Sequence, residues 1–179
     1  MRKFLVAAIL TAMTLLPAAA RAGFLMEASL GKGYTAAPKD SRGWEQLNLE
    51  LAPGYSPSLP VLSMFRLQLG IVMDFADKKA STTDMELRPM LSLVPPVFPL
   101  YGRVIVGVSH LLERGDSKRK FVYGGALGVK IGLPGIAFVP ALGVFAEVGL
   151  LPRTIDATAT AASATAWTIE GRVGAYINF

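Results

Sequence analysis

The end of the chain alternates between apolar and polar residues without a break. One set of alternate positions is apolar throughout: Trp167, Ile169, Gly171, Val173, Ala175, Ile177 and Phe179. The positions between them are mostly polar or charged and include Glu170 and Arg172. A period of two predicts a β-strand with one apolar face. About ten residues of this kind are what a strand in the wall of a transmembrane β-barrel requires.

Similar alternation recurs along the chain and predicts eight strands. Their expected ranges are Phe24–Tyr34, Trp44–Ala52, Val61–Phe75, Met85–Val94, Leu100–Leu112, Phe121–Leu133, Val139–Leu150 and Trp167–Phe179. Pro89 lies on the apolar face of the fourth segment and has no N–H to donate, so we expect a bulge or an open pairing there. The pattern predicts an all-β fold, an eight-stranded antiparallel up-and-down transmembrane β-barrel over residues 23–179.

The connections between these segments alternate in length and charge. Those after the second, fourth and sixth segments are short, uncharged and rich in proline and glycine. Those after the odd-numbered segments are longer and mostly charged, and the last of them contains Arg153 and Asp156. Bacterial outer-membrane barrels have short periplasmic turns and longer extracellular loops. We therefore expect the loops outside the cell and both mature termini in the periplasm.

The first 22 residues have the features of a secretory signal peptide. Arg2 and Lys3 precede a short apolar stretch, and Ala20 and Ala22 form a small-x-small cleavage site. The apolar stretch is too short to span a bilayer as a helix, which disfavours the alternative of an uncleaved membrane anchor. We expect the mature chain to begin at Gly23.

Charge and cysteine content exclude several classes of function. The chain has 18 Lys and Arg against 13 Asp and Glu, but three of the bases lie in the predicted signal peptide. The mature chain is therefore close to neutral, and the high sequence pI does not indicate nucleic-acid binding. The sequence contains no cysteine, which excludes a disulfide framework and thiolate chemistry.

A soluble barrel with its apolar face inward is the main alternative to a membrane barrel, because alternation alone does not say which face points outward. The apolar face carries almost no charge, and the polar face is rich in glycine and nearly lacks lysine, unlike a solvated surface. Aromatic residues also gather near both ends of the segments, as in the two girdles of a membrane barrel. One group comprises Trp44, Phe75, Phe121, Tyr123 and Trp167, and the other comprises Phe24, Phe98, Tyr101, Phe138, Tyr176 and Phe179. These features favour the membrane barrel.

The polar faces place acids and bases inside the barrel in near balance. Counted from the strand ends, the outer half contains Asp74, Glu86, Arg88, Glu147, Glu170 and Arg172. The inner half contains Glu27, Glu50, Arg66, Arg103 and Lys130. Because an eight-stranded barrel is just wide enough for side chains to fill, we expect an ion-pair network that plugs the lumen. The alternative is a narrow cation-preferring path, or a cation site at the acid-rich outer mouth.

Little in the sequence points to catalysis. His110 is the only histidine, and its neighbour Ser109 faces the opposite side of the strand, so the two do not form a nucleophile–base pair. By parity His110 faces lipid near the outer rim, where a lipid-modifying enzyme would act. No metal-ligand spacing, phosphate-binding loop or nucleotide motif is present, so we expect no enzyme and no cofactor.

One basic run has a candidate partner. Lys118, Arg119 and Lys120 fall in an expected outer loop, where they would meet the phosphates of outer-leaflet lipopolysaccharide. Ordinary solvated loop charge is the alternative interpretation.

In pattern and size the mature chain resembles the small eight-stranded outer-membrane barrels, the group of the OmpA transmembrane domain, OmpX and OmpW. Phe179 resembles the terminal signature by which the barrel-assembly machinery recognises such proteins. The resemblance implies a structural, adhesive or small-solute role without choosing among them. Three hypotheses stay open: a monomeric structural or loop-binding barrel, a narrow channel for small or apolar solutes, and a lipid-modifying enzyme that depends on His110.

Overall fold

The computed structural model describes most of the chain from Gly23 onward. The described residues are 23–37, 39, 42–57, 59, 62–75, 85–96, 98–109, 120–133, 141–155 and 164–179. The predicted signal peptide lies outside these ranges, as do His110, Lys118 and Arg119, and only the backbone of Lys120 is described. The hypotheses that rest on these residues stay predictions.

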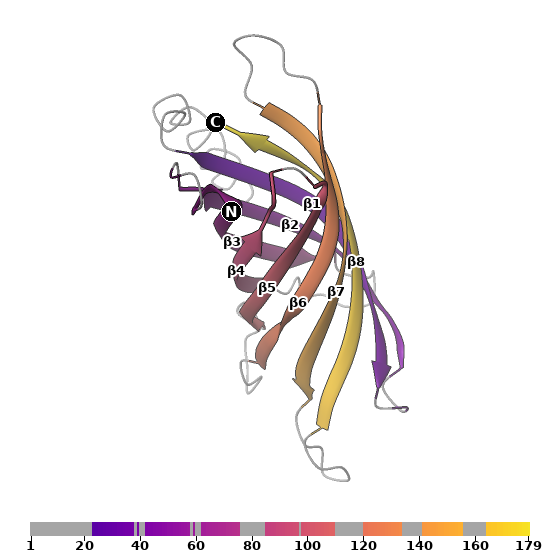
Figure 1. Ribbon diagram of the computed structural model, residues 1–179. Helices are drawn as coiled ribbons and strands as arrows, with labels where there is room; N and C mark the ends of the chain where they lie inside the picture. The colour runs from indigo at the N-terminus through magenta and orange to yellow at the C-terminus, as the bar shows by residue number, and fades with distance from the viewer. Residues whose placement is uncertain are drawn as a thin grey trace, which may run out of the picture.

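The expected strands close into an eight-stranded barrel (Figure 1). They are β1 (Phe24–Ala37), β2 (Gly43–Tyr55), β3 (Phe65–Asp74), β4 (Met85–Leu93), β5 (Leu100–Ser109), β6 (Lys120–Gly132), β7 (Ala141–Ile155) and β8 (Ala164–Asn178). Each strand pairs antiparallel with the next, and β8 pairs with β1. A short 3₁₀ turn, η2 (Leu62–Met64), precedes β3, and no helix in the described ranges is long and apolar enough to cross a membrane. The predicted all-β up-and-down topology is confirmed.

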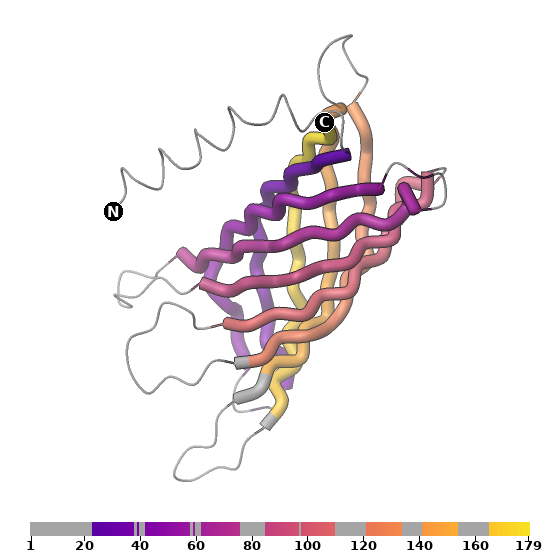
Figure 2. Tube along the Cα trace, turned by 90° about the vertical axis from the view of Figure 1, so that its left-hand side faces the viewer, coloured from indigo at the N-terminus to yellow at the C-terminus, as the bar shows by residue number. Residues whose placement is uncertain are grey.

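The first and last strands form a seam along the barrel. Their pairing runs from Leu25 opposite Asn178 to Ala37 opposite Trp167. Beyond the last strand residue, the N–H of Phe179 donates to the carbonyl of Phe24 at 2.9 Å. The end of β8 therefore lies beside the start of β1 (Figure 2). We call this end of the barrel the terminal end. We call the opposite end the hairpin end; it carries the connections β1–β2, β3–β4, β5–β6 and β7–β8.

The barrel is apolar outside and polar inside. Large apolar side chains that point outward are exposed, among them Leu67, Leu91, Val104, Leu127, Val148 and Val173. Glutamates, arginines and Lys130 occupy the alternate positions and are buried. This is the reverse of a water-soluble barrel and is the distribution that a hydrocarbon environment requires. The structure therefore decides the orientation of the faces that alternation left open.

Several strand ends differ from the sequence prediction. β7 and β8 remain paired up to Ile155 opposite Ala164, beyond the predicted end of the seventh segment at Leu150. The added pairs include the β-branched residues Thr154, Ile155 and Thr165, which favour strands. Arg153, which we expected in a loop, therefore lies in the barrel wall. The longer strands also reduce the expected contrast in length, because the β1–β2 connection is only residues 38–42 and the β2–β3 connection is residues 56–64. The contrast in charge is complete, because every charged connection lies at the hairpin end.

The pairing is irregular at several points, and the β1–β8 register also shifts between Thr35 and Ala37. At Pro89 the β4–β5 register pairs Leu87 with Val108 and resumes at Met90 with Ile105, so the ladder opens there without a bulge. A bulge occurs instead in β2, where the β1–β2 register shifts between Lys32 and Tyr34. The bulge places Glu45 and Gln46 opposite Gly33 and turns Glu45 toward the lumen.

Candidate functional site

The predicted charged residues all fall on the inward face of the wall. Nine of them are buried: Glu27, Glu50, Glu86, Arg88, Arg103, Lys130, Glu147, Glu170 and Arg172. Arg66 and Asp74, near the two ends of β3, are half-buried. The contacts divide the buried residues into two clusters, each of which spans the lumen.

The first cluster, which we call the Arg88 cluster, comprises Glu50, Glu86, Arg88, Glu170 and Arg172. The Arg88 Nη1 atom lies 2.9 Å from Glu170 Oε2 and 3.5 Å from Glu50 Oε2, and its Nε donates to Glu86. The Arg172 Nη1 atom lies 2.6 Å from Glu50 Oε2, and its Nη2 lies 2.7 Å from Glu170 Oε1. Two guanidinium groups thus share carboxylates from β2, β4 and β8, which joins opposite walls.

This cluster continues toward the hairpin end through residues that the sequence analysis missed. The Arg153 Nη2 atom lies 3.7 Å from Glu86 and 3.9 Å from Glu45. Glu45 Oε1 accepts hydrogen bonds from the hydroxyls of Thr35 and Thr168 at 2.9 and 2.8 Å. The hairpin half of the lumen is therefore also filled by a polar network.

The second cluster, the Arg103 cluster, comprises Glu27, Arg103, Lys130 and Glu147. The Arg103 Nη2 atom lies 2.6 Å from Glu27 Oε2, and its Nη1 lies 3.1 Å from Glu147 Oε2. Its Nε donates to the hydroxyl of Ser92 at 2.9 Å. The Lys130 ammonium also pairs with Glu27. Because a buried charge without a partner is costly, these contacts hold both guanidinium and ammonium in place.

Aromatic rings surround the ammonium of Lys130. Its Nζ lies 4.8 Å from the Tyr101 ring centroid, 5.5 Å from that of Phe145 and 5.2 Å from that of Tyr176. The Tyr101 hydroxyl donates to Glu147. We expected Tyr101 and Tyr176 in an aromatic girdle, and this is wrong for both. Their positions have the same parity as the inward charges, so their rings fill the lumen.

The layering that we expected by counting from strand ends is wrong for two residues. Glu50 belongs to the Arg88 cluster rather than to the inner half, and Glu147 belongs to the Arg103 cluster rather than to the outer half. The strands of a barrel are tilted and staggered, so equal counts from different strand ends do not reach equal heights.

A comparison with solved structures identifies the kind of barrel. The structure of Neisserial surface protein A (NspA) superposes with a TM-score of 0.56 and 15% sequence identity, over 88% of this chain and 97% of that one. No protein-family model matches the sequence, and no curated protein matches it. The chain has the fold of a small eight-stranded outer-membrane β-barrel. The expected class is confirmed at the level of the fold.

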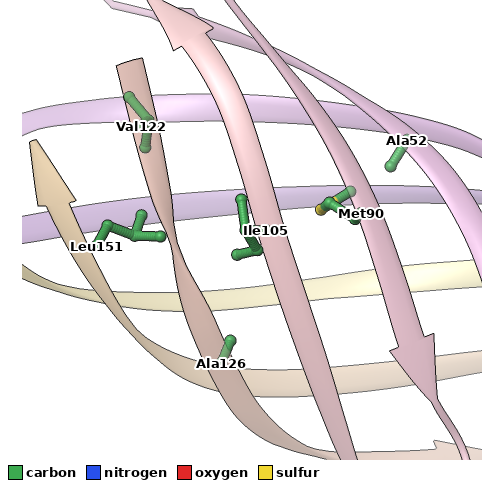
Figure 3. Close-up of a cluster of buried hydrophobic side chains, with 6 residues drawn as sticks. All are labelled: Ala52, Met90, Ile105, Val122, Ala126 and Leu151. Carbon is green, nitrogen blue, oxygen red and sulfur yellow. The ribbon is translucent and has the colours of Figure 1, made fainter. Parts of the chain in front are cut away.

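The lumen of this outer-membrane-type barrel also contains an apolar cluster, which the sequence analysis did not predict. Its members are Ala52, Met90, Ile105, Val122, Ala126 and Leu151 (Figure 3). Met90 follows Arg88 on the inward face of β4, and Ile105 follows Arg103 on that of β5. Met90 and Ile105 therefore lie between the two charged clusters on this side of the barrel and bring apolar side chains into the polar lumen.

Arg66 is the exception among the lumen cations. Its Nε and Nη1 atoms are buried and have no hydrogen-bond partner in the described part of the chain. Its guanidinium lies 5.8 Å from the Tyr176 ring centroid and borders a cavity of about 250 Å³ at the terminal end, with Asn178 and Phe179. Arg66 is held by a ring contact rather than by a carboxylate, which makes it a natural comparison for the paired arginines.

The acidic side chains of the two clusters are engaged within the lumen. Each buried carboxylate of the two clusters accepts from a guanidinium, an ammonium or a hydroxyl, so it is already engaged as an acceptor. Within the described residues, no group of three or more histidine, cysteine or acidic side chains is arranged to hold a metal ion.

Proposed function

We propose that the protein is a non-conducting, non-enzymatic barrel of the bacterial outer membrane, with a structural role or a binding role at its hairpin-end connections. The observation that carries this proposal is the joining of opposite walls by the two charged clusters. A continuous path would require ion pairs such as Arg103–Glu27 to break while both charges stay buried. The apolar exterior and the NspA-like fold support the membrane location.

The proposal places the hairpin end outside the cell and both termini in the periplasm. All charged connections lie at the hairpin end, and those at the terminal end carry no charge. Phe179, the expected assembly signal, lies at the terminal end beside Phe24. This arrangement lets the terminal strand meet the assembly machinery from the periplasmic side.

Single-channel recording tests the closed lumen. Protein purified from membranes, and shown to be folded by a gel shift between boiled and unboiled samples, is added to a planar bilayer. We expect no discrete conductance, whereas an open porin in the same bilayer gives large steps. Reproducible steps from the folded protein would contradict the plug and support the channel hypothesis.

Cysteine labelling tests the orientation, because the natural chain contains no cysteine. Lys39→Cys places a thiol at the hairpin end, and Leu59→Cys places one at the terminal end; both positions are exposed. A membrane-impermeant maleimide should label the first variant in intact cells and the second only after the outer membrane is disrupted. The opposite pattern would reverse the proposed orientation.

An acyl-release assay tests the absence of enzymatic activity. The folded protein is incubated with phospholipid and lipopolysaccharide, and free fatty acid is measured. We expect none above the blank. Release that disappears in His110→Ala would establish the lipid-modifying enzyme instead.

A further inference from the structure

Among the strand side chains that the structure describes, Lys32 is the one charged group on the outward face. It lies on β1 and is exposed, and its outward neighbours on the same strand are Leu30 and Tyr34. A lysine on the lipid face costs roughly 2–4 kcal/mol at the bilayer midplane and about 0–1 kcal/mol near the interface. Charged side chains that persist in membrane-spanning segments commonly have a function.

The neighbours of Lys32 place it just below the aromatic belt of the hairpin end. In the β1–β2 pairing Lys32 is opposite Leu47, and the next pair toward the hairpin end is Tyr34 with Trp44. The two rings pack edge to face, with centroids 5.2 Å apart, and the Lys32 Nζ lies 5.3 Å from the Trp44 ring centroid. Aromatic belts mark the headgroup level, and a lysine one step below can extend its ammonium to that level.

An apolar groove of about 700 Å³ begins beside Lys32 on the outer surface of the barrel. It crosses β8, β7 and β6, which run side by side in Figure 1. Small residues form its floor at Gly171, which is paired with Lys32, and at Ala146. A Cβ added at Gly171 would meet nothing within 4 Å, so the space next to the lysine stem is open. Its walls include Leu30, Leu127, Val129 and Val148.

We propose that this groove, with Lys32 at its rim, is a binding site for the phosphorylated lipid A part of lipopolysaccharide. One acyl chain lies in the groove over Gly171, and a lipid A phosphate accepts hydrogen bonds from the Lys32 ammonium, which Trp44 supports from its other side. The choice of lipid A rests on the proposed orientation, which puts the hairpin end in the outer leaflet. Glu147 and Arg172 also border the groove, but their side chains are buried in the lumen clusters. Lys32 is the one charged residue of the lining that is exposed, so charge complementarity supports an anionic headgroup.

Lipid titration tests this site. The protein is reconstituted in phosphatidylcholine nanodiscs and titrated with purified lipid A, and the bound lipid is counted by native mass spectrometry. We expect saturable binding that is weakened about fivefold in Lys32→Gln, since a lysine near an anionic lipid surface contributes about 1 kcal/mol. Lys39→Gln, an exposed lysine of the β1–β2 connection, is the matched control and should bind as the natural protein does.

A second variant separates the groove from the charge. Gly171→Leu fills the floor of the groove and keeps Lys32, so it should also weaken binding. Lipid A without its phosphates should bind the natural protein as weakly as intact lipid A binds Lys32→Gln. All variants are first shown to be folded by their gel shift.

Three results would overturn the inference. The first two are equal lipid A binding by Lys32→Gln and the natural protein, and unchanged lipid A binding by Gly171→Leu. The third is displacement of bound lipid A by phosphatidylglycerol at the same concentration at which added lipid A displaces it. These are distinguishable from a failure of the proposed function. If maleimide labelling puts the hairpin end outside and binding still fails, the lipid site alone is wrong. If labelling is reversed, the proposed orientation itself is wrong.

Discussion

The Nη2 atom of Arg103 on β5 and the Oε2 atom of Glu27 on β1 lie 2.6 Å apart across the lumen. The same guanidinium contacts Glu147 on β7 and Ser92 on β4. One side chain thus connects four strands of the wall that are not all neighbours. Apart from Lys32, the outward faces of the described strands carry no charge and make no ion pairs of this kind. The contacts inside the lumen therefore determine which strands lie across from one another in the closed barrel.

Removing this arginine should be costly. In Arg103→Met the carboxylates of Glu27 and Glu147 stay buried and lose a partner, which should lower the free energy of unfolding by about 3–5 kcal/mol. Arg66→Met is the matched control, because Arg66 makes no ion pair among the described residues, and it should cost less than about 1 kcal/mol. Chemical unfolding in lipid bilayers measures both.

A double variant checks the cause of this loss. Glu147→Gln combined with Arg103→Met removes the carboxylate that loses its cation, while Glu27 keeps its pair with Lys130, so part of the stability should return. Equal stability of the two single arginine variants would show that the Arg103 contacts do not stabilise the barrel.

The Tyr101 hydroxyl should stabilise the fold through its hydrogen bond to Glu147. Tyr101→Phe keeps the ring and removes the donor to a buried carboxylate, which should cost about 1–3 kcal/mol of unfolding free energy. Tyr123→Phe is the control, since Tyr123 points outward and is exposed. Unfolding curves for the two variants should separate clearly; curves that coincide would argue against a strong lumen hydrogen bond.

Gly124 should be intolerant of any side chain. Its φ of 157° is one that residues with a Cβ rarely adopt, and an added Cβ would lie 2.1 Å from the carbonyl oxygen of Leu150. Gly124→Ala should therefore lower the free energy of unfolding by about 1–3 kcal/mol and reduce the folded fraction in the gel-shift assay. Gly102→Ala, where the nearest atom to the new Cβ is a Leu127 methyl at 3.7 Å, should fold normally.

The cost of an outward charge should depend on its depth in the membrane. Leu127 lies midway along β6 and is 75% exposed, so Leu127→Arg should destabilise the bilayer-inserted barrel by roughly 2–4 kcal/mol. Phe121→Arg, near the hairpin end of the same strand, should cost about 0–1 kcal/mol. Equal and small costs in lipid would contradict a membrane-embedded wall.

Much of the fold could be predicted because lipid outside the barrel imposes a strict period of two. From that constraint alone, the sequence predicts that charges such as Arg88, Lys130 and Glu170 face inward. The pattern fails where the backbone departs from it. The β2 bulge shifts the parity by one, so Glu45 could not be assigned to the lumen, and Arg153 was missed because pairing with β8 continues beyond a proline at position 152.

Contacts between strands were harder to predict than faces. Which carboxylate meets which guanidinium depends on the stagger of the strands around the barrel. That stagger cannot be inferred from the residue pattern of any single strand. Glu50 and Glu147 were assigned to the wrong layers for this reason. Tyr101 shows a different difficulty, because an aromatic residue near a strand end fits an interfacial girdle as well as a lumen.

The seam between β1 and β8 has a consequence for how the barrel forms and lasts. It joins the strands that are farthest apart along the chain. Bringing them together costs more chain entropy than pairing two consecutive strands, so the β1–β8 contacts should form late. Until it forms, two rows of unpaired N–H and C=O groups face hydrocarbon, where each costs several kcal/mol. Closure is then all-or-none. A closed barrel should open slowly, since the first step of opening exposes both rows to lipid again.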